Sequence, residues 1–362
     1  MDGDTVMLAE QATLGSLLLD PALIDRVRGW LRPGDFGEWW HGQVYTVLLE
    51  HRAAGQPVDL EALAQTMVDR LGERSGGRLR IVDLLHTAPG HPVTATYARM
   101  VVEASLRREI AGQGVLLRAG ALQSALSASA GPLASACLMV DTTLESIDGR
   151  WADANGQRRH TPNAPTPIRP AAHQLELRTG ADKFLADRPA RDPDAEHAHV
   201  IDLIGSLLAH PETIPGVAAW LRPAQVPDPG WRAVYTAATD LAARGEPVDA
   251  VTVSWAVAPL RRSGTSVPSP RELCKAVDTG WLDRPARAAR IVAGEQVCAL
   301  AERASNQLTA AAEDPALEIS GVLDTAALFT AALRHAAVGL SRDGTATRAV
   351  KPRVLSRGPV AG

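Results

Sequence analysis

The residues that could bind nucleotide phosphates are scarce in this chain. Only three of its 37 basic Lys and Arg residues are lysines, and none of the three follows a glycine. A P-loop requires Gly-Lys-Ser/Thr because that lysine reaches the β- and γ-phosphates of the nucleotide. No G-x-G-x-x-G fingerprint of a dinucleotide site opens a helix either. We therefore expect no Walker A motif, no nucleotide cofactor and no motor enzyme. The lysines are Lys183, Lys275 and Lys351.

The sequence also contains little evidence for a metal site or a nucleophilic residue. The three cysteines form no CxxC pair, which predicts small apolar side chains in a reducing compartment. His41 has no second His or Cys at metal-ligand spacing, so we expect a structural histidine. No Ser/His/Asp arrangement or carboxylate pair stands out. We expect no catalytic residue, no metal site and no cofactor.

Composition favours helices. Hydrophobic residues make up 46 % of the 362 residues and aromatic residues only 4 %, and much of the apolar share is alanine, which favours helix. The N-terminal residues Met1–Asp4 are acidic and lack the basic start of a secretory signal. No apolar run reaches the ~18 residues of a membrane span. We predict an all-α, cytoplasmic protein that does not enter a membrane.

The sequence contains an internal repeat. Four motifs recur 190 residues later with no insertion or deletion between them, which indicates a duplication. Each unit has the size of a domain, unlike the ~20–50 residues of a solenoid repeat. Ala98-Arg99-Met100-Val101 also recurs, at an offset of 191, as Ala289-Arg290-Ile291-Val292. The four pairs are Gly15-Ser16-Leu17-Leu18 with Gly205-Ser206-Leu207-Leu208, Trp30-Leu31-Arg32-Pro33 with Trp220-Leu221-Arg222-Pro223, Val44-Tyr45-Thr46 with Val234-Tyr235-Thr236, and Gly55-Gln56-Pro57-Val58-Asp59 with Gly245-Glu246-Pro247-Val248-Asp249.

Apolar spacing and helix breakers predict six helices and a hairpin arm in the first copy. Asp20 and Asp59 are expected N-caps, and Gly55 an expected left-handed C-cap. A long helix is expected from Val93 past Leu116. We expect Trp30 and Trp220 in the core, and Trp39 either in the core or at a partner contact.

The predicted organisation is two tandem helical-bundle domains, each a compact multi-helix globule plus a helical hairpin. Six prolines among polar residues predict an extended, flexible linker between the copies, with a weakly supported helix near 175–185. A polar segment after the second copy predicts a basic, disordered tail. The expected boundaries are 1–148 and 195–338 for the two copies, 149–194 for the linker and 339–362 for the tail.

Charge separates the folded copies from the tail. Residues 1–148 carry 12 basic and 18 acidic side chains, residues 195–338 carry 12 and 16, and the tail carries 5 and 1. Because phosphate neutralisation supplies most non-specific DNA affinity, the acidic copies are poor DNA binders. The tail either contacts nucleic acid or an acidic partner, or is a solvated tail without a specific role. Its candidate contact residues are Arg348, Lys351, Arg353 and Arg357.

Six motifs of the first copy occur in the same order as in a known protein family. They include Ala9-Glu10-Gln11, Leu31-Arg32-Pro33-Gly34-Asp35-Phe36, His41, and Leu106-Arg107-Arg108. Residues 8–148 resemble the N-terminal domain of DnaB-type replicative helicases. The resemblance implies a non-catalytic collar domain whose hairpin pairs with a neighbouring subunit and which binds primase or a helicase loader. In that family a separate RecA-like domain hydrolyses ATP. The second copy departs from the pattern, with Val200-Ile201 for Glu10-Gln11, Val226 for Phe36 and Trp231 for His41.

One apolar seam is the candidate hairpin interface. Its residues repeat at spacings of 4-3-4-3, which suits an antiparallel helical hairpin. The seam either closes against its own partner helix or also pairs with a second hairpin, in an intramolecular pseudo-dimer or a homodimer. The seam residues are Leu133, Cys137, Val140, Leu144 and Ile147.

Two functions remain open from the sequence. The first is a protein-interaction module of DNA replication that binds replicative helicase, primase or helicase loader. The alternative is a nucleic-acid-binding replication factor, or a component of a split helicase, that makes weak DNA contacts through the basic tail and linker.

Overall fold

The computed structural model describes residues 3–73, 78–88, 93–157, 171–280 and 284–340, without the side chains of 171–174. All regular structure within these ranges is helical, which confirms the predicted all-α fold. No helix in the described part of the chain is long and apolar enough to cross a membrane. The chain divides into two compact units, and each contains residues from both copies of the repeat. Unit 1 comprises 1–121, 133–190 and 298–333, and unit 2 comprises 122–132, 191–297 and 334–362.

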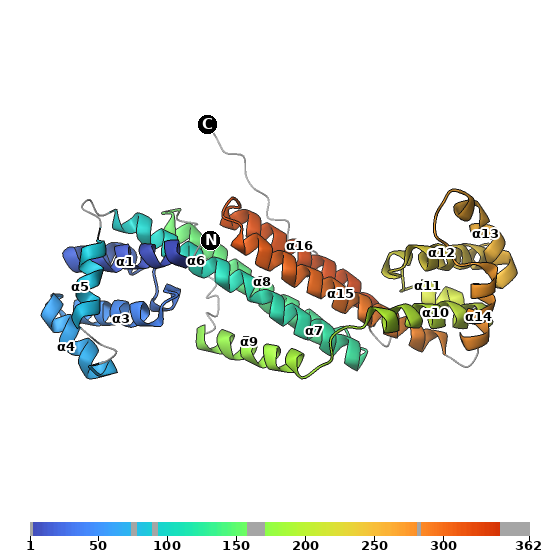
Figure 1. Cartoon of the computed structure of the whole chain (residues 1–362), viewed down its shortest axis with the longest axis horizontal. Coiled ribbons are helices and arrows are strands. Elements are labelled where there is room, and N and C mark those ends of the chain that lie inside the picture. Colours follow the sequence, from blue (N-terminus) through green and yellow to red (C-terminus); the bar gives the residue numbers. More distant parts are fainter. Residues whose placement is uncertain (1–2, 74–77, 89–92, 158–170, 281–283, 341–362) are drawn as a thin grey trace, which may run out of the picture. The chain divides into compact units, whose positions relative to one another are not determined.

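The globule of the first copy lies in unit 1 (Figure 1). Its first helix is buried along its C-terminal half, where it packs against the fifth and sixth helices. Leu14 and Leu17 are fully buried there, and each stabilises the fold by about 1.5–3 kcal/mol. The elements are α1 (Gly3–Leu19), η1 (Pro21–Leu23), α2 (Ile24–Val27), η2 (Pro33–Asp35), α3 (Trp39–Ala54), α4 (Leu60–Leu71) and α5 (Arg78–Thr87).

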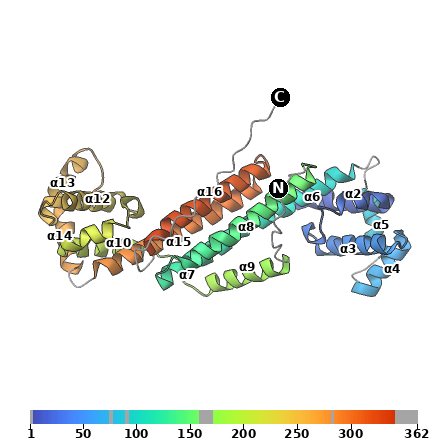
Figure 2. The same cartoon turned by 180° about the vertical axis from the view of Figure 1, so that it is seen from behind.

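The hairpin of the first copy consists of α6 (Thr94–Ala111), α7 (Gln113–Ser127) and α8 (Gly131–Ala154). The predicted long helix is divided at Gly112, whose backbone stays in the right-handed helical region, so α7 continues α6 after one residue. Within unit 1, α8 runs beside the 298–333 segment of the second copy in both views (Figure 1, Figure 2).

The second copy repeats the order of elements. Its globule lies in unit 2, and α10 packs against α14 there as α1 packs against α5. A single helix, α15, takes the place of α6 and α7. The elements are α10 (Pro193–Ala209), η3 (Pro211–Thr213), α11 (Ile214–Ala218), η4 (Pro223–Gln225), α12 (Pro229–Ala243), α13 (Ala250–Arg262), α14 (Pro270–Gly280), α15 (Pro285–Glu313), α16 (Ile319–Ala337) and η5 (Val338–Leu340).

The repeated glycine of the first helix marks a close helix crossing. A Cβ atom on Gly15 would collide with the carbonyl oxygen of Leu84 in α5. A Cβ atom on Gly205 would collide with the carbonyl oxygen of Ala276 in α14. Because backbone atoms cannot move aside, both crossings require glycine. The recurrence of this residue therefore follows from packing.

The repeated tyrosine ties the third helix to the segment before it. The Tyr45 hydroxyl donates to the carbonyl oxygen of Leu31 at 3.5 Å, and the Tyr235 hydroxyl donates to that of Leu221 at 2.8 Å. Both side chains are fully buried, and burial raises the pKa of each. The tyrosines thus anchor the same turn in both globules.

The predicted caps are confirmed. Asp20 accepts from the Ala22 N–H at 3.1 Å, and Asp59 accepts from the Ala62 N–H at 2.8 Å. Gly55 ends α3 in the left-handed region at φ 64°, which favours glycine. Asp249 caps α13 in the same way as Asp59 caps α4.

Three expectations need correction. The segment 149–194 is not extended throughout: α8 continues to Ala154, and α9 (Ala171–Ala186) forms a helix within it. Residues 158–170 lie outside the described part. The tail begins later than predicted, since Gly339 and Leu340 are buried and Gly339 lies against Trp220. The two equivalent tryptophans of the expected core are only half-buried. Of the two alternatives for Trp39, its 62 % exposure excludes the core.

Candidate functional site

A buried carboxylate links three elements of the first globule. Glu10, on α1, is 1 % exposed and accepts from the backbone N–H groups of Gly37 at 2.5 Å and Glu38 at 3.3 Å. Its other contact is with Nδ1 of His41 at 2.7 Å, at the start of α3. The carboxylate is fully satisfied by hydrogen bonds, which is the condition for burying it. The expectation of a structural role for His41 is confirmed.

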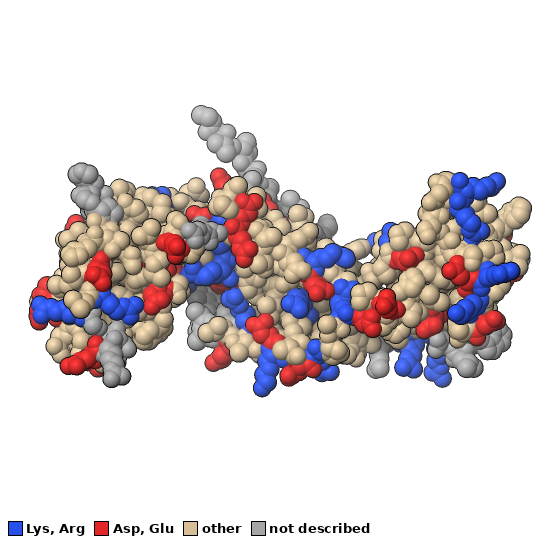
Figure 3. Space-filling view, in the orientation of Figure 1, with Lys and Arg blue, Asp and Glu red and all other residues tan. Residues whose placement is uncertain are grey.

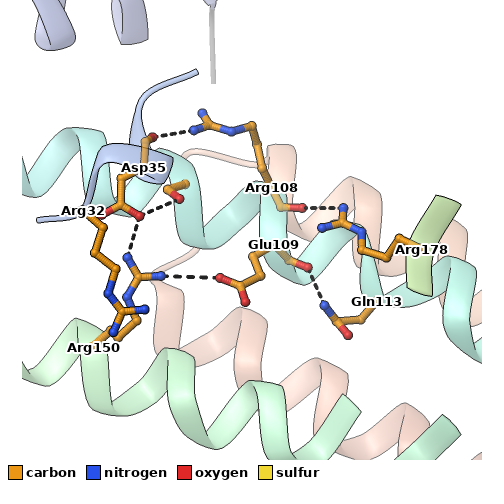
Figure 4. Close-up of polar contacts among 8 residues, drawn as sticks. Arg32, Asp35, Arg108, Glu109, Gln113, Arg150 and Arg178 are labelled. Atoms are coloured by element: carbon orange, nitrogen blue, oxygen red, sulfur yellow. Dashed lines mark hydrogen bonds and ion pairs between the residues drawn. The ribbon is translucent and has the colours of Figure 1, made fainter. Parts of the chain in front are cut away.

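A second polar cluster joins the globule to its hairpin. Asp35, at the end of η2, is 2 % exposed and accepts from the Arg150 Nη2 at 2.5 Å and the Ser105 hydroxyl at 3.0 Å. Its second carboxylate oxygen accepts from the Arg32 N–H at 2.8 Å. Arg108 donates to the Asp35 carbonyl oxygen at 2.7 Å. One short turn is thereby fixed to both α6 and α8 (Figure 4).

The cluster continues along α6 through Glu109. Arg150 also reaches the Glu109 carboxylate at 3.5 Å, and burial raises the pKa of Glu109 while the Arg150 charge opposes that rise. Gln113 donates to the Glu109 carbonyl oxygen at 3.0 Å. Arg178 of α9 donates to the Arg108 carbonyl oxygen at 3.4 Å (Figure 4). Helix α9 is therefore attached to the junction of α6 and α7.

Arg107 holds the hairpin turn of the second copy. Its guanidinium is 5 % exposed and is fixed by Glu103, one turn earlier on α6, at 2.7 Å. It donates to the carbonyl oxygens of Ala312 at 3.3 Å, Asp314 at 2.9 Å and Leu317 at 2.5 Å. These carbonyls lie at the end of α15 and in the turn before α16. One side chain of copy 1 thus satisfies three backbone acceptors of copy 2 within unit 1.

Close backbone packing continues this contact along α7. A Cβ atom on Gly114 would lie 2.8 Å from the Ser305 Cα atom of α15. The two helices approach closely because Gly114 has no side chain, and Ser305 itself is buried. The hairpins of the two copies are therefore in direct contact in unit 1.

The predicted seam residues all become buried on α8. Their exposed fractions range from 0 % to 7 %. Helix α16 has buried side chains at the same 4-3-4-3 spacing. The pairing of the α8 seam, either with its own partner helix alone or also with the second hairpin, stays a prediction. The buried α16 residues are Ile319, Leu323, Ala326, Thr330 and Leu333.

A cavity of about 390 Å³ lies beside the Arg107 contact. It is lined by residues of α1, α6 and the α15 end, and its charged lining includes Glu10, Arg107 and Arg108, all of which are hydrogen-bonded to the protein. Among the described residues, no group of three or more His, Cys, Asp or Glu side chains could hold a metal ion. The contacts of the hairpins described above are the candidate site.

Sequence reasoning missed the roles of Arg107 and Arg150. Arg107 falls among the buried positions of α6, beside Leu106 and Ile110, and an arginine there signals a buried acceptor. The tail residues Arg348, Lys351, Arg353 and Arg357 lie outside the described part of the chain.

Comparison with known proteins places these features in a family. The model of the DnaB-like helicase N terminal domain matches residues 5–103 and 189–273, together just over half of the chain. No solved structure matches the chain.

Relatives among characterised proteins match one part of the chain. It is 31 % identical over 103 residues to the replicative DNA helicase DnaC of Bacillus subtilis, covering 28 % of this chain and 23 % of that protein. It is 34 % identical over 110 residues to the replicative DNA helicase DnaB of Mycobacterium leprae, covering 30 % and 18 %. The chain thus spans less than a quarter of the length of these relatives, and the matched stretches lie in their N-terminal region. With two matched copies and the predicted helical fold, this chain belongs to the DnaB-like helicase N-terminal domain family.

Proposed function

We propose that this chain is a non-catalytic protein-interaction module of DNA replication that binds a replicative helicase, a primase or a helicase loader. Two family matches support a role related to replicative helicases. The net acidic charge of both copies supports a protein partner over DNA for the folded part.

The observation that carries the proposal is the Arg107 contact. The family resemblance implies hairpins that pair between subunits, and here a hairpin turn of one copy is held by an arginine of the other copy in the same chain. A linked pair forms at high effective concentration, so the chain would present a paired-hairpin collar surface without a second subunit. Sedimentation equilibrium is expected to give a monomer. A stable homodimer would contradict the intramolecular pseudo-dimer.

The binding test uses purified components. The full chain is titrated against replicative helicase, primase and loader after nuclease treatment, with isothermal calorimetry as the readout. Binding to one of the three is expected, with little dependence on salt. Absence of binding to all three would overturn the proposal.

The matched variant is the chain shortened to residues 1–340, which retains the buried Leu340. Protein binding should be unchanged in it. If the alternative holds, the full chain binds DNA with a steep salt dependence and the shortened chain does not. That result would assign nucleic-acid binding to the basic tail.

A further inference from the structure

Helices α4 and α13 occupy equivalent places in the two globules, but their solvent-facing surfaces differ. On α4 the exposed positions are polar and engaged with other side chains. Glu61 accepts from Arg78 at 2.5 Å, and Arg70 donates to Glu50 at 2.6 Å. Gln65 donates to Asp69 at 2.7 Å within the helix. This is an ordinary solvated helix surface.

The same positions on α13 are apolar. At the offset of 190, Glu61, Gln65 and Arg70 correspond to Val251, Trp255 and Leu260. Val251 is 76 % exposed, Trp255 is 84 % exposed and Leu260 is 41 % exposed. Val251 and Trp255 are one helical turn apart, with Pro259 one turn further, so they form a stripe along the helix. An exposed apolar stripe that contains tryptophan is typical of a protein-binding surface.

Charge indicates what covers the stripe. Helix α13 contains no acidic residue and ends in Arg261 and Arg262. Arg262 is exposed and lies eleven residues after Val251, about three turns along the same side. Figure 3 shows both basic and acidic side chains on this end of unit 2. The stripe is thus apolar with a positive end.

We propose that the α13 stripe (Val251, Trp255, Pro259 and Arg262) is a docking surface for an acidic amphipathic helix of a partner protein. Trp255 is the anchor, and acidic side chains of the partner pair with Arg262. A second copy of this chain has no acidic side chain within α13 to pair with Arg262, and it is the alternative occupant that the test distinguishes. The chain's own tail fits less well, since it carries five basic residues and one acidic residue.

The proposal rests on the proposed role as an interaction module and adds one surface to it. The test uses the full chain and three synthetic helical peptides that share one apolar stripe at i, i+3, i+4 and i+7 spacing. Their remaining positions carry Glu, Gln or Lys. Fluorescence anisotropy of the labelled peptides measures the Kd. The Glu peptide is expected to bind most tightly.

Variants separate the anchor from the charge. Trp255→Ala should weaken the Glu peptide by at least about ten-fold, as expected for a central aromatic anchor. Arg262→Glu should reduce the preference for Glu over Lys several-fold, while Arg261 is left unchanged because it donates to the Pro268 carbonyl oxygen. Gln65→Ala, at the equivalent place on α4, is the matched control and should change nothing.

Two results would overturn the proposal. One is equal binding of the three peptides, or Glu-peptide binding that Trp255→Ala leaves unchanged. The other is a concentration-dependent dimer in sedimentation velocity that Trp255→Ala abolishes, which would assign the stripe to a second copy. Failure here with retained binding to helicase, primase or loader overturns only this inference. Peptide selectivity without binding to those three overturns only the proposed function.

Discussion

The two globules have the same order of helices, but at one equivalent buried position copy 1 has polar side chains and copy 2 has apolar ones. Between the first and third helices, copy 1 buries Glu10 against His41, while copy 2 buries Val200 and Trp231. Both arrangements support the same order of helices. The polar cluster is therefore not required by the fold, because apolar residues of suitable volume occupy the same position in copy 2.

The turn after the short second helix shows the same division. Asp35 and Gln225 accept the equivalent backbone N–H group, from Arg32 and Arg222, each at 2.8 Å. Among the described residues, Asp35 also binds a hairpin arginine, Arg150, and no such contact is seen at Gln225. The shared hydrogen bond shapes the turn, and the additional one connects it to α8. In copy 1 the turn thus also connects the globule to its hairpin.

The sharpest way to test this comparison is to remove one half of the buried pair. His41→Ala leaves the Glu10 carboxylate buried with only backbone partners, and the expected loss is about 3–5 kcal/mol of unfolding free energy. Urea unfolding followed by circular dichroism measures the loss.

The matched variant transplants the second copy into the first. Glu10→Val, Phe36→Val and His41→Trp together introduce the residues of Val200, Val226 and Trp231. This triple variant should be more stable than His41→Ala alone. If it is less stable, the two globules differ in more than the residues that are buried between their first and third helices.

The next largest effect is expected at Arg107. Its equivalent in copy 2, at the offset of 191, is Cys298, so Arg107→Cys makes the two copies alike. The change removes charged hydrogen bonds to three carbonyl oxygens, and the expected loss is at least that of one such bond, about 1.5–3 kcal/mol. Hydrogen exchange of the 312–318 turn should become faster. Arg99→Cys, which replaces a half-buried α6 arginine whose Nε donates to Ala95 within the same helix, is the control and should leave that exchange unchanged.

The glycine crossings test what the two globules share. Gly15→Ala and Gly205→Ala should each destabilise their own globule by about 1–3 kcal/mol, because the new Cβ atom meets a carbonyl oxygen. Differential scanning calorimetry measures the loss. Gly216→Ala, on α11, has open space around the new atom and should be tolerated. A large effect at only one crossing would show that the crossings are not equivalent.

The features that the sequence predicted are local ones. Helix spacing, the Asp caps and the Gly55 C-cap depend on neighbouring residues, and they are found as expected. The contacts of Arg107 with the second copy join residues more than 200 positions apart, and no local pattern encodes that pairing. The half-buried Trp30 and Trp220 show the same limit, since equivalent positions in a repeat need not be core positions. The exposed Trp255 stands out only when α13 is compared with α4.

The smallest expected effect is the pH dependence of the helix cap at Asp249. The N–H of Thr252 donates to Asp249 and holds the pKa of this carboxyl below its usual value. Because the pKa is lowered in the folded state, the cap's contribution is present above the unfolded pKa of 3.8 and is lost as the pH falls through the lowered value. Asp249→Ala should therefore cost about 1 kcal/mol at pH ~7, and its Tm difference from the unmodified chain should shrink at pH ~3.

Asp249→Asn keeps an acceptor for the α13 N–H groups but does not titrate, so it isolates the ionisation. Its stability should stay near that of the unmodified chain at neutral pH, and its capping contribution should not change as the pH falls. If Asp249→Ala and Asp249→Asn lose the same amount at neutral pH, the cap acts through charge and not through the hydrogen bond. In that case the equivalence of Asp249 and Asp59 would lie in their position before the helix, with the helix dipole as the common cause.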